Sequence, residues 1–201
     1  MDLFSKEHST IEIPLPDASI SYYPTFFGPE EADALYEELY RETPWQQDDI
    51  KIFGKVYAQP RLTALYGSEE KTYRYSGLTM YPKLFTPTLL EIKDRVEKET
   101  GNHFNAVLLN LYRDGNDSNG WHSDDEKELG TNPVIASVSL GAKRCFQLKH
   151  KRDKKLKYKL FLNHGSLLLM SGETQHHWKH QLPKTKKINV PRINLTFRAL
   201  K

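Results

Sequence analysis

The feature that most constrains the fold is a succession of short apolar runs that begins after Gly101. Most runs end near turn sequences such as Asp114-Gly115 and Asn163-His164-Gly165. Short runs rich in apolar and β-branched residues, separated by turn residues, are typical of β-strands. They predict a β-sandwich or jelly roll in the C-terminal half. The runs are residues 106–112, 134–140, 144–149, 158–162, 166–170 and 192–199.

Two amphipathic segments precede these runs and predict helices. The first begins at Gly28-Pro29 and runs to about Glu42, with acidic residues in its first turn that suit the helix dipole. The second runs from Pro87 to Thr100, and Gly101 follows where a C-terminal cap is expected. Helices followed by strands predict an α+β protein. The 201 residues contain no internal repeat or Gly/Ser linker, so we expect one structural domain.

Composition excludes several classes of protein. No apolar stretch is long enough to span a bilayer, and the start of the chain lacks the basic and apolar regions of a signal peptide. The single cysteine, Cys145, excludes an intramolecular disulfide and a cysteine-based zinc site. We therefore expect a protein that is neither secreted nor membrane-bound, cytoplasmic in a bacterium and nuclear in a eukaryote. No oligomerisation signal is visible, which favours a monomer.

The net charge of +3 hides a strong asymmetry along the chain. Residues 1–50 hold two basic and twelve acidic side chains, whereas residues 143–201 hold sixteen basic and two acidic ones. A basic C-terminal half indicates a polyanionic partner such as nucleic acid. The alternative is a solvated lysine-rich face with no partner.

His122 and Asp124 form a candidate metal-binding pair. Their two-residue spacing on an extended segment points both side chains to one side. A distant histidine would complete the 2-His-1-carboxylate triad of non-haem Fe(II) oxygenases, which leaves coordination positions open. A surface hydrogen bond between the two residues is the simpler alternative. The candidates for the third ligand are His164, His176, His177 and His180. His164 is expected in a turn, and His176 and His177 are expected side by side on a strand, where they face opposite ways. The same alternation places His176 and His180 on one face, so it does not choose between these two.

The run after Pro191 suggests an anion site. Strand alternation places Arg192, Asn194, Thr196 and Arg198 on one face, opposite an apolar face. Two buried guanidiniums need an anion, and a dicarboxylate would satisfy both through paired hydrogen bonds. The alternative is an exposed strand with two solvated arginines.

These segments together resemble the AlkB family of Fe(II)- and 2-oxoglutarate-dependent dealkylating dioxygenases, most closely the branch of its second and third human homologues. The resemblance extends from about Ile52 to Arg198. It implies a double-stranded β-helix (jelly-roll) core with N-terminal helices and a nucleotide-recognition lid. The motifs that carry it are Pro60-Arg61, 75–79 (YSGLT), Asn110-Leu111-Tyr112, 121–126 (WHSDDE), 136–139 (ASVS), 178–183 (WKHQLP) and 191–198 (PRINLTFR).

The resemblance implies a division of the chain and a ligand set. It divides the chain into an N-terminal extension (1–50), a lid with its supporting helix (51–104) and the oxygenase core (105–201). It makes His122, Asp124 and His180 the iron ligands, which are also the catalytic centre. It assigns 2-oxoglutarate, the cosubstrate used with O2, to Asn110, Tyr112, Arg192, Asn194, Thr196 and Arg198.

The family's substrate contacts fall on two groups of residues. Phe53 matches a finger residue that enters a duplex and fills the space of a flipped base, a role that suits an apolar side chain. Tyr73 and Tyr75, with the adjoining Ser76, match the pocket that covers the base. Without the resemblance, Phe53 would be assigned to a core, and a core position is an open alternative for Tyr73.

Charged residues complete the implied substrate site. Glu126 is expected to favour a cationic methylated base, and Asp125 to orient the site or an arginine. Both could instead be loop charges in water. The basic tract 149–159 and the cluster that includes Lys186 and Lys187 match loops beside the nucleic-acid backbone.

The expected function is oxidative demethylation of N1-methyladenine- and N3-methylcytosine-type bases in DNA, single- or double-stranded, with release of formaldehyde, succinate and CO2. One alternative is the same chemistry on RNA, a protein side chain or a small molecule. Another is a catalytically silent nucleic-acid-binding module, although such a module has no need of a metal triad and an anion clamp.

Overall fold

The computed structural model describes residues 9–52, 55–68, 73–75, 78–80 and 82–201. Its largest unit is an eight-stranded main sheet, made of β1 (Ile11–Glu12), β2 (Ser19–Tyr23), β5 (Leu62–Gly67), β8 (Lys83–Leu84), β9 (Ala106–Tyr112), β11 (Ile135–Gly141), β14 (Ser166–Ser171) and β16 (Arg192–Arg198). The strand order is β1-β2-β14-β11-β16-β9-β5-β8. All neighbours are antiparallel except β5 and β8, which are parallel.

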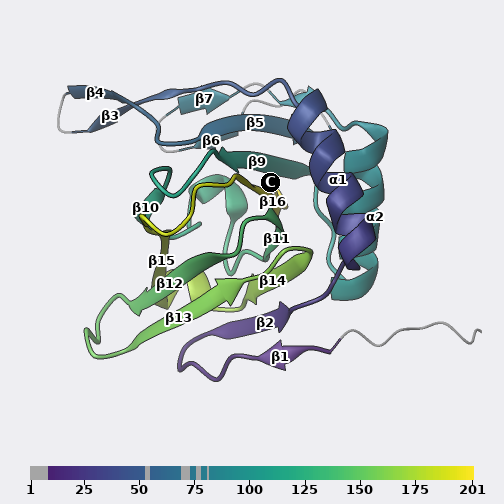
Figure 1. The fold of residues 1–201 in the computed structure, drawn as a ribbon. Helices are drawn as coiled ribbons and strands as arrows, with labels where there is room; N and C mark the ends of the chain where they lie inside the picture. Colours follow the sequence, from purple (N-terminus) through teal and green to yellow (C-terminus); the bar gives the residue numbers. More distant parts are fainter. Residues whose placement is uncertain (1–8, 53–54, 69–72, 76–77, 81) are drawn as a thin grey trace, which may run out of the picture.

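A smaller antiparallel sheet faces the main sheet (Figure 1). It contains β10 (Asn119–His122), β12 (Arg144–His150), β13 (Lys157–Leu162) and β15 (Trp178–Leu182), in the order β10-β15-β12-β13. A buried cluster between the sheets joins side chains of both, among them Ile135 and Leu168 from the main sheet and Leu148 from the small one. Two facing sheets, antiparallel except for the β5–β8 pair, with flanking helices confirm the predicted α+β class and jelly-roll core.

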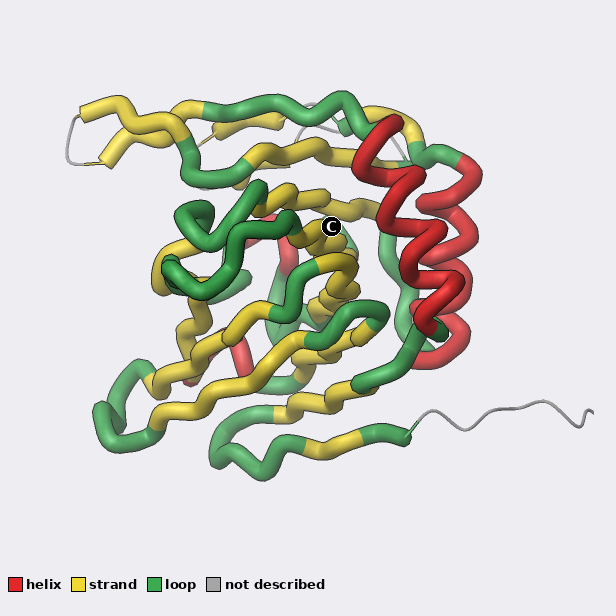
Figure 2. The backbone as a smooth tube through the Cα atoms, viewed as in Figure 1, coloured by secondary structure: helices red, strands yellow, loops and turns green. Residues whose placement is uncertain are grey.

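Two helices cover the other face of the main sheet with their apolar side chains. The helices α1 (Pro29–Glu42) and α2 (Pro87–Thr100) lie side by side there (Figures 1 and 2). Both have the predicted bounds. The Thr86 side chain accepts a hydrogen bond from the backbone N–H of Leu89 at the start of α2, and Gly101 ends it at a φ of 67°. Among the described residues, no helix is long and apolar enough to cross a membrane.

The order of elements along the chain differs from the prediction, which placed the helices before the strands. β1 and β2 precede α1, and six further strands separate the two helices. These include two hairpins, β3 (Asp49–Ile52) with β4 (Lys55–Ala58) and β6 (Tyr73–Tyr75) with β7 (Leu78–Met80). β2 and β5 lie within the main sheet, so the sheet needs strands from the N-terminal half. The prediction failed because most of these strands have only two to five residues, and because β5, which has six, is recognisable only by its partner.

The prediction that His176 and His177 lie on a strand is wrong. They belong to a short helical turn, α3 (Thr174–His177), and β15 begins one residue later at Trp178. The carbonyl oxygen of Glu173 accepts from the backbone N–H groups of both histidines. The strand alternation used for these two residues therefore does not apply.

Candidate metal centre and cosubstrate pocket

A polar pocket lies between the two sheets, and strand alternation on β16 explains its lining. Arg192, Asn194, Thr196 and Arg198 line the pocket, whereas Ile193, Leu195 and Phe197 pack in the core beneath the helices. All seven side chains of β16 are buried, so the alternative of an exposed strand face is wrong.

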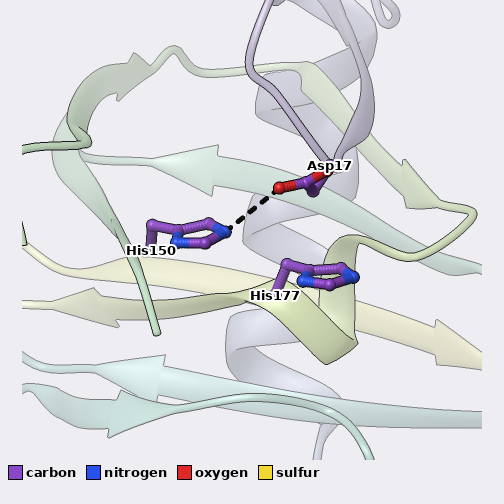
Figure 3. A group of neighbouring side chains, drawn as sticks. All are labelled: Asp17, His150 and His177. Atoms are coloured by element: carbon purple, nitrogen blue, oxygen red, sulfur yellow. Dashed lines mark ion pairs between the residues drawn. The ribbon is translucent and has the colours of Figure 1, made fainter. Parts of the chain in front are cut away.

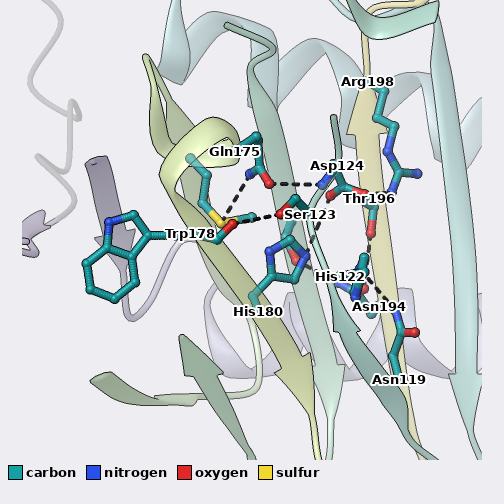
Figure 4. A network of polar contacts seen from close by, with 12 residues as sticks. Asn119, His122, Ser123, Asp124, Gln175, Trp178, His180, Asn194, Thr196 and Arg198 are labelled. Carbon is teal, nitrogen blue, oxygen red and sulfur yellow. Dashed lines mark hydrogen bonds and ion pairs between the residues drawn. The ribbon is translucent and has the colours of Figure 1, made fainter. Parts of the chain in front are cut away.

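His122, Asp124 and His180 converge in this pocket (Figure 4). His122 ends β10, and the strand register pairs it with His180 on β15. Asp124 follows His122 by two residues. Donor atoms of the three residues all lie within 4.8 Å of one another, and His180 Nε2 is 3.8 Å from Asp124 Oδ2. Among the four histidines that the sequence left open as a third ligand, the structure brings His180 to the pair.

The other three histidines lie elsewhere. His164 Nδ1 accepts a hydrogen bond from the backbone N–H of Gly141, so this histidine stabilises a turn. His176 is exposed, and His177 Nε2 lies 3.6 Å from the carboxylate of Glu173.

The hydrogen bonds of His122 prepare it to bind a metal. Its Nδ1 lies 2.7 Å from the carbonyl oxygen of Gly120, which can only accept, so Nδ1 carries the proton. Nε2 is then unprotonated and carries a lone pair, and it lies 3.3 Å from Nδ2 of Asn119. Metal-binding histidines typically donate a hydrogen bond from the ring nitrogen that does not bind the metal, as Nδ1 does here, and this bond fixes the tautomer.

Asp124 is held as a buried anion. Its Oδ1 accepts from Arg198 Nη2 at 2.8 Å, and its backbone N–H donates to Gln175 Oε1 at 3.0 Å (Figure 4). Burial alone would raise the pKa of Asp124, but Arg198 and the two histidines outweigh it and hold the pKa far below its ordinary value. Burial, followed by the neighbouring His122, lowers the pKa of His180 to about 3. An anionic carboxylate and two neutral imidazoles fit a divalent cation such as Fe(II).

A second group, Asp17, His150 and His177, is also compact enough to hold a cation (Figure 3). The tautomer of His150 argues against this. Its Nδ1 accepts from the backbone N–H of Asp153 at 2.9 Å, so the proton of the neutral ring is on Nε2, the atom that faces Asp17 at 3.4 Å. A protonated Nε2 donates to a carboxylate and cannot bind a metal. We interpret this group as a contact that fastens the N-terminal segment to β12.

Arg192 is the residue of the pocket that most needs an anion. Its Nη2 donates to Ser139 Oγ at 2.8 Å, while its Nε is buried and has no hydrogen-bond partner among the described residues. Burial lowers the pKa of Arg192 to about 10. A buried guanidinium with an unused donor fits a carboxylate of a small ligand.

The neighbouring polar side chains are ordered by hydrogen bonds among themselves. Asn194 Nδ2 donates to Ser137 Oγ at 2.8 Å, and Thr196 Oγ1 donates to Asn194 Oδ1 at 3.1 Å. On β9, Asn110 and Tyr112 line the same pocket. The guanidinium of Arg192 lies 5.4 Å from the centre of the Tyr112 ring. The structure thus brings together all six residues that were predicted for the cosubstrate, with Arg198 bound to Asp124.

Sequence reasoning missed the individual roles of several residues around the pocket. Arg61 is buried, and its Nε donates to Asn110 Oδ1 at 2.8 Å. Gln175 holds the backbone of Asp124, and Phe146 stacks on the His180 ring with centroids 5.2 Å apart. The signal for Arg61 was present, because Pro60-Arg61 is one of the segments that resemble the AlkB family.

The predicted base-recognition residues are only partly described. Phe53 and Ser76 lie outside the described residues. Tyr73 and Tyr75 lie on β6, and their side chains are likewise outside the described part. Their predicted roles stay predictions.

The two carboxylates after Asp124 have different surroundings. Asp125 is exposed and accepts from Lys151 Nζ at 2.9 Å. Glu126 is partly buried, and its Oε2 has no hydrogen-bond partner among the described residues. Burial, followed by the charge of Asp124, raises the pKa of Glu126 to about 6. Lys186 and Lys187 are exposed on the loop between β15 and β16.

Comparisons with known proteins agree with this geometry. Residues 19–198 match the family described as the 2OG-Fe(II) oxygenase superfamily. The chain is 44% identical over 191 residues to alpha-ketoglutarate-dependent dioxygenase alkB homolog 3 of Bos taurus, and this match covers 88% of the chain and 64% of that protein. It is 44% identical over 188 residues to DNA oxidative demethylase ALKBH2 of Homo sapiens, covering 89% of the chain and 72% of that protein.

The fold also matches a solved structure. OsALKBH1 superposes with a TM-score of 0.69 at 15% identity, over 95% of this chain and 100% of that one. At this identity the likeness concerns the fold alone.

The superfamily description implies Fe(II), 2-oxoglutarate and O2. The His122–Asp124–His180 group could bind the iron, and the pocket beside it contains the buried Arg192. Geometry, family match and sequence identity therefore agree that this chain belongs to the 2OG-Fe(II) oxygenase superfamily and, within it, to the AlkB family, in the branch of alkB homologues two and three.

Proposed function

We propose that this chain removes alkyl groups from damaged DNA bases by oxidation. The observation that carries the proposal is a group of two histidines and one carboxylate, with Asp124 and His180 buried, next to a buried arginine with an unused donor. It is supported by the 44% identity to a human protein named DNA oxidative demethylase. The substrates are N1-methyladenine- and N3-methylcytosine-type bases in DNA. RNA is a further candidate substrate.

In this proposal the chain's residues bind and orient the reactants. His122, Asp124 and His180 hold Fe(II), and Arg198 keeps the Asp124 carboxylate ionised and oriented. Arg192 binds a carboxylate of 2-oxoglutarate, while Asn110, Tyr112, Asn194 and Thr196 shape the rest of the cosubstrate site. When bound, iron and 2-oxoglutarate supply the oxidation of the N-alkyl carbon by O2, which yields succinate, CO2, formaldehyde and the repaired base.

The Glu126 carboxylate is proposed to select the damaged base. A methyl group on N1 of adenine or N3 of cytosine makes the base cationic, whereas the undamaged base is neutral at this nitrogen. A partly buried carboxylate with an unused oxygen favours the cationic form. Asp125, which pairs with Lys151, would orient this segment.

The remaining substrate contacts are proposed from the family resemblance. Phe53 would fill the space of the flipped base, and Tyr73, Tyr75 and Ser76 would cover that base. Lys186 and Lys187 would contact backbone phosphates.

We also propose that the chain acts as a monomer of one structural domain. The three parts 1–50, 51–104 and 105–201 contribute β2, β5 and β9 to the same main sheet, which supports a single folding unit. Sedimentation of the purified chain at a micromolar concentration would test the monomer.

The function is tested by mass spectrometry of repaired oligonucleotides. The full chain is incubated with Fe(II), ascorbate, 2-oxoglutarate and a DNA or RNA strand that carries one N1-methyladenine or N3-methylcytosine. We expect each repaired strand to lose the mass of one CH2 unit. His122→Ala should abolish repair because it removes a metal ligand, and His176→Ala, which changes an exposed histidine outside the pocket, should not.

Two results would contradict the proposal. Binding of the oligonucleotide by wild type without a change in mass would favour a silent binding module. Formation of succinate with neither binding nor repair would favour a different substrate.

A further inference from the structure

Arg144 is a buried cation that takes no part in the proposed chemistry. It begins β12, and only 1% of it is exposed. Its Nη1 donates to the carbonyl oxygen of Asp114, and its Nη2 donates to those of Asp117 and Pro183, all at 2.9 Å. Burying a guanidinium on backbone carbonyls is costly. The three hydrogen bonds of Arg144 therefore indicate that it holds parts of the structure together.

The three carbonyls belong to two loops that are far apart in sequence. Asp114 and Asp117 lie in the loop 113–118, between β9 and β10, which we call the turn loop. Pro183 begins the loop 183–191, between β15 and β16, which we call the lysine loop. Arg144 thus joins the two loops by donating hydrogen bonds to both.

Gly115 joins the same two loops at close range. Its backbone N–H donates to the carbonyl oxygen of Ile188 at 2.9 Å, and its own carbonyl accepts from the backbone N–H of Thr185 at 2.8 Å. A Cβ atom at position 115 would overlap the Thr185 carbonyl oxygen and would lie 2.7 Å from that of Ile188. Only glycine allows this approach.

The lysine loop contains no helix or strand, and Lys184, Lys186 and Lys187 on it are exposed. A loop of this kind loses conformational entropy when it binds a ligand unless the free protein already orders it. Hydrogen bonds with Arg144 and Gly115 supply this order at Pro183 before the lysine cluster, at Thr185 within it and at Ile188 after it.

We propose that Arg144 and Gly115 are positioning residues that hold the lysine loop in the conformation that presents Lys186 and Lys187 to the phosphates of the substrate. This inference rests on the proposed function, because it needs a nucleic-acid substrate. It predicts that the loop contributes to binding only while its contact with the turn loop is intact.

Gly115 is the better position for the test. The guanidinium of Arg144 lies 5.8 Å from the centre of the Tyr112 ring, so a change at Arg144 also disturbs the cosubstrate pocket. Gly115→Ala acts on the loop contact directly. Gly28→Ala is the matched control, because a Cβ atom there meets no atom within 4 Å.

The experiment measures binding of a fluorescent, unmodified single-stranded DNA at several salt concentrations. The full chain is saturated with Fe(II) and 2-oxoglutarate and kept anaerobic, so no turnover occurs. We expect Gly115→Ala to weaken binding several-fold and to reduce the slope of log affinity against log salt by about 1 to 2, since about 0.7 ions are released per phosphate contact on single strands. The affinity for 2-oxoglutarate should not change, and Gly28→Ala should bind DNA like wild type.

A double-mutant cycle separates positioning from general damage. The double variant Lys186→Ala/Lys187→Ala should weaken binding in the wild-type chain but have little further effect in Gly115→Ala. Additive losses would overturn the proposal, as would unchanged binding by Gly115→Ala when the lysine variant binds weakly. If the lysine variant itself binds like wild type, the phosphate contacts of the proposed function fail instead, and the positioning role fails with them.

A second variant keeps the test valid if Gly115→Ala does not fold. Arg144→Lys retains the charge but replaces a planar group that spans three carbonyls with a single ammonium. We expect it to lower DNA affinity and the salt slope in the same direction. Wild-type values for both would overturn the role of Arg144.

Discussion

At the scale of single residues, hydrogen bonds decide which histidines can bind a metal. His122 and His150 each lie beside a carboxylate and another histidine. The Gly120 carbonyl fixes the proton of His122 on Nδ1 and leaves Nε2 unprotonated, whereas the backbone N–H of Asp153 fixes the opposite tautomer in His150. The two groups therefore have the same donor types, but only the first suits a metal.

Arg192 offers a direct test of the cosubstrate site. We expect Arg192→Met to weaken 2-oxoglutarate binding by about 2 to 5 kcal/mol, because a buried carboxylate would lose its paired donors. Arg192→Lys should recover only part of this loss, since an ammonium cannot form the paired bond. Calorimetric titration of the metal-loaded chain with 2-oxoglutarate measures both.

The exposed Arg152 provides the control for this prediction. Arg152→Met should bind 2-oxoglutarate like wild type. Wild-type affinity in Arg192→Met would exclude Arg192 from the cosubstrate site.

At the scale of elements, local sequence signals predicted some helices and strands, whereas others are recognisable only from their partners in the folded structure. α2 has the predicted bounds because Thr86 and Gly101 cap its ends and its apolar stripe has helical spacing. The strand β9 also has its predicted bounds, since a seven-residue apolar run has few alternatives. β5 was not predicted as a strand, although it pairs with β9 inside the main sheet. Its identity depends on that partner.

The turn between β9 and β10 gives a prediction about pH. Asp117 is buried and accepts from the backbone N–H and from two guanidinium nitrogens of Arg113. Burial alone would raise the pKa of Asp117, but these bonds outweigh it and lower the pKa. A lowered folded-state pKa stabilises the fold above the ordinary value of about 3.9, and this stabilisation is lost as the pH falls through the folded-state pKa.

We therefore expect Asp117→Asn to unfold more readily than wild type at neutral pH, by on the order of 2 kcal/mol. The difference should shrink below about pH 4, where Asp117 becomes protonated in the unfolded chain. Urea unfolding at a series of pH values measures it. Asp94→Asn, at an exposed site on α2, should show no such pH-dependent difference, and a difference for Asp117→Asn that stays constant with pH would refute the prediction.

At the scale of the whole molecule, folding redistributes the charge asymmetry of the sequence. Part of the acidic N-terminal segment meets basic partners from later in the chain, since Glu31 pairs with Arg95, and Asp17 and Asp33 face His150 and His164. Part of the acidic charge of this segment is therefore paired within the fold.

Three basic residues of the small sheet, by contrast, lie next to one another. Lys149 pairs in register with Lys179 on one side and Lys157 on the other, so three lysines lie in one row across adjacent strands. None of the four strands of this sheet contains an aspartate or glutamate. Lys149 Nζ also lies 4.2 Å from the centre of the Trp121 ring. Like charges in opposed positions destabilise a sheet, and a polyanion bound to this face would offset that repulsion.

The row predicts two opposite effects for the double variant Lys157→Gln/Lys179→Gln. Stability should rise by about 0.2 to 1 kcal/mol per relieved pair. Affinity for DNA should fall, with a salt slope smaller by about 1 per lost phosphate contact. Thermal unfolding and fluorescence anisotropy measure the two effects, and Lys98→Gln on α2 is the control. Unchanged DNA affinity would show that the row is a solvated face.

The sequence by itself determined the two helices, most strands of the C-terminal half, the pairing of His122 with Asp124 and the polar face of β16. These depend on spacing along a single segment, which periodicity reports directly. It could not choose the third histidine, assign Arg61 to Asn110 or distinguish the tautomers of His122 and His150. The third histidine and the Arg61–Asn110 bond join segments that are far apart in the chain, and only the register of β10 with β15 and of β5 with β9 brought these segments together. The tautomers depend on contacts with backbone groups two or three residues away, which the periodicity of a sequence does not report.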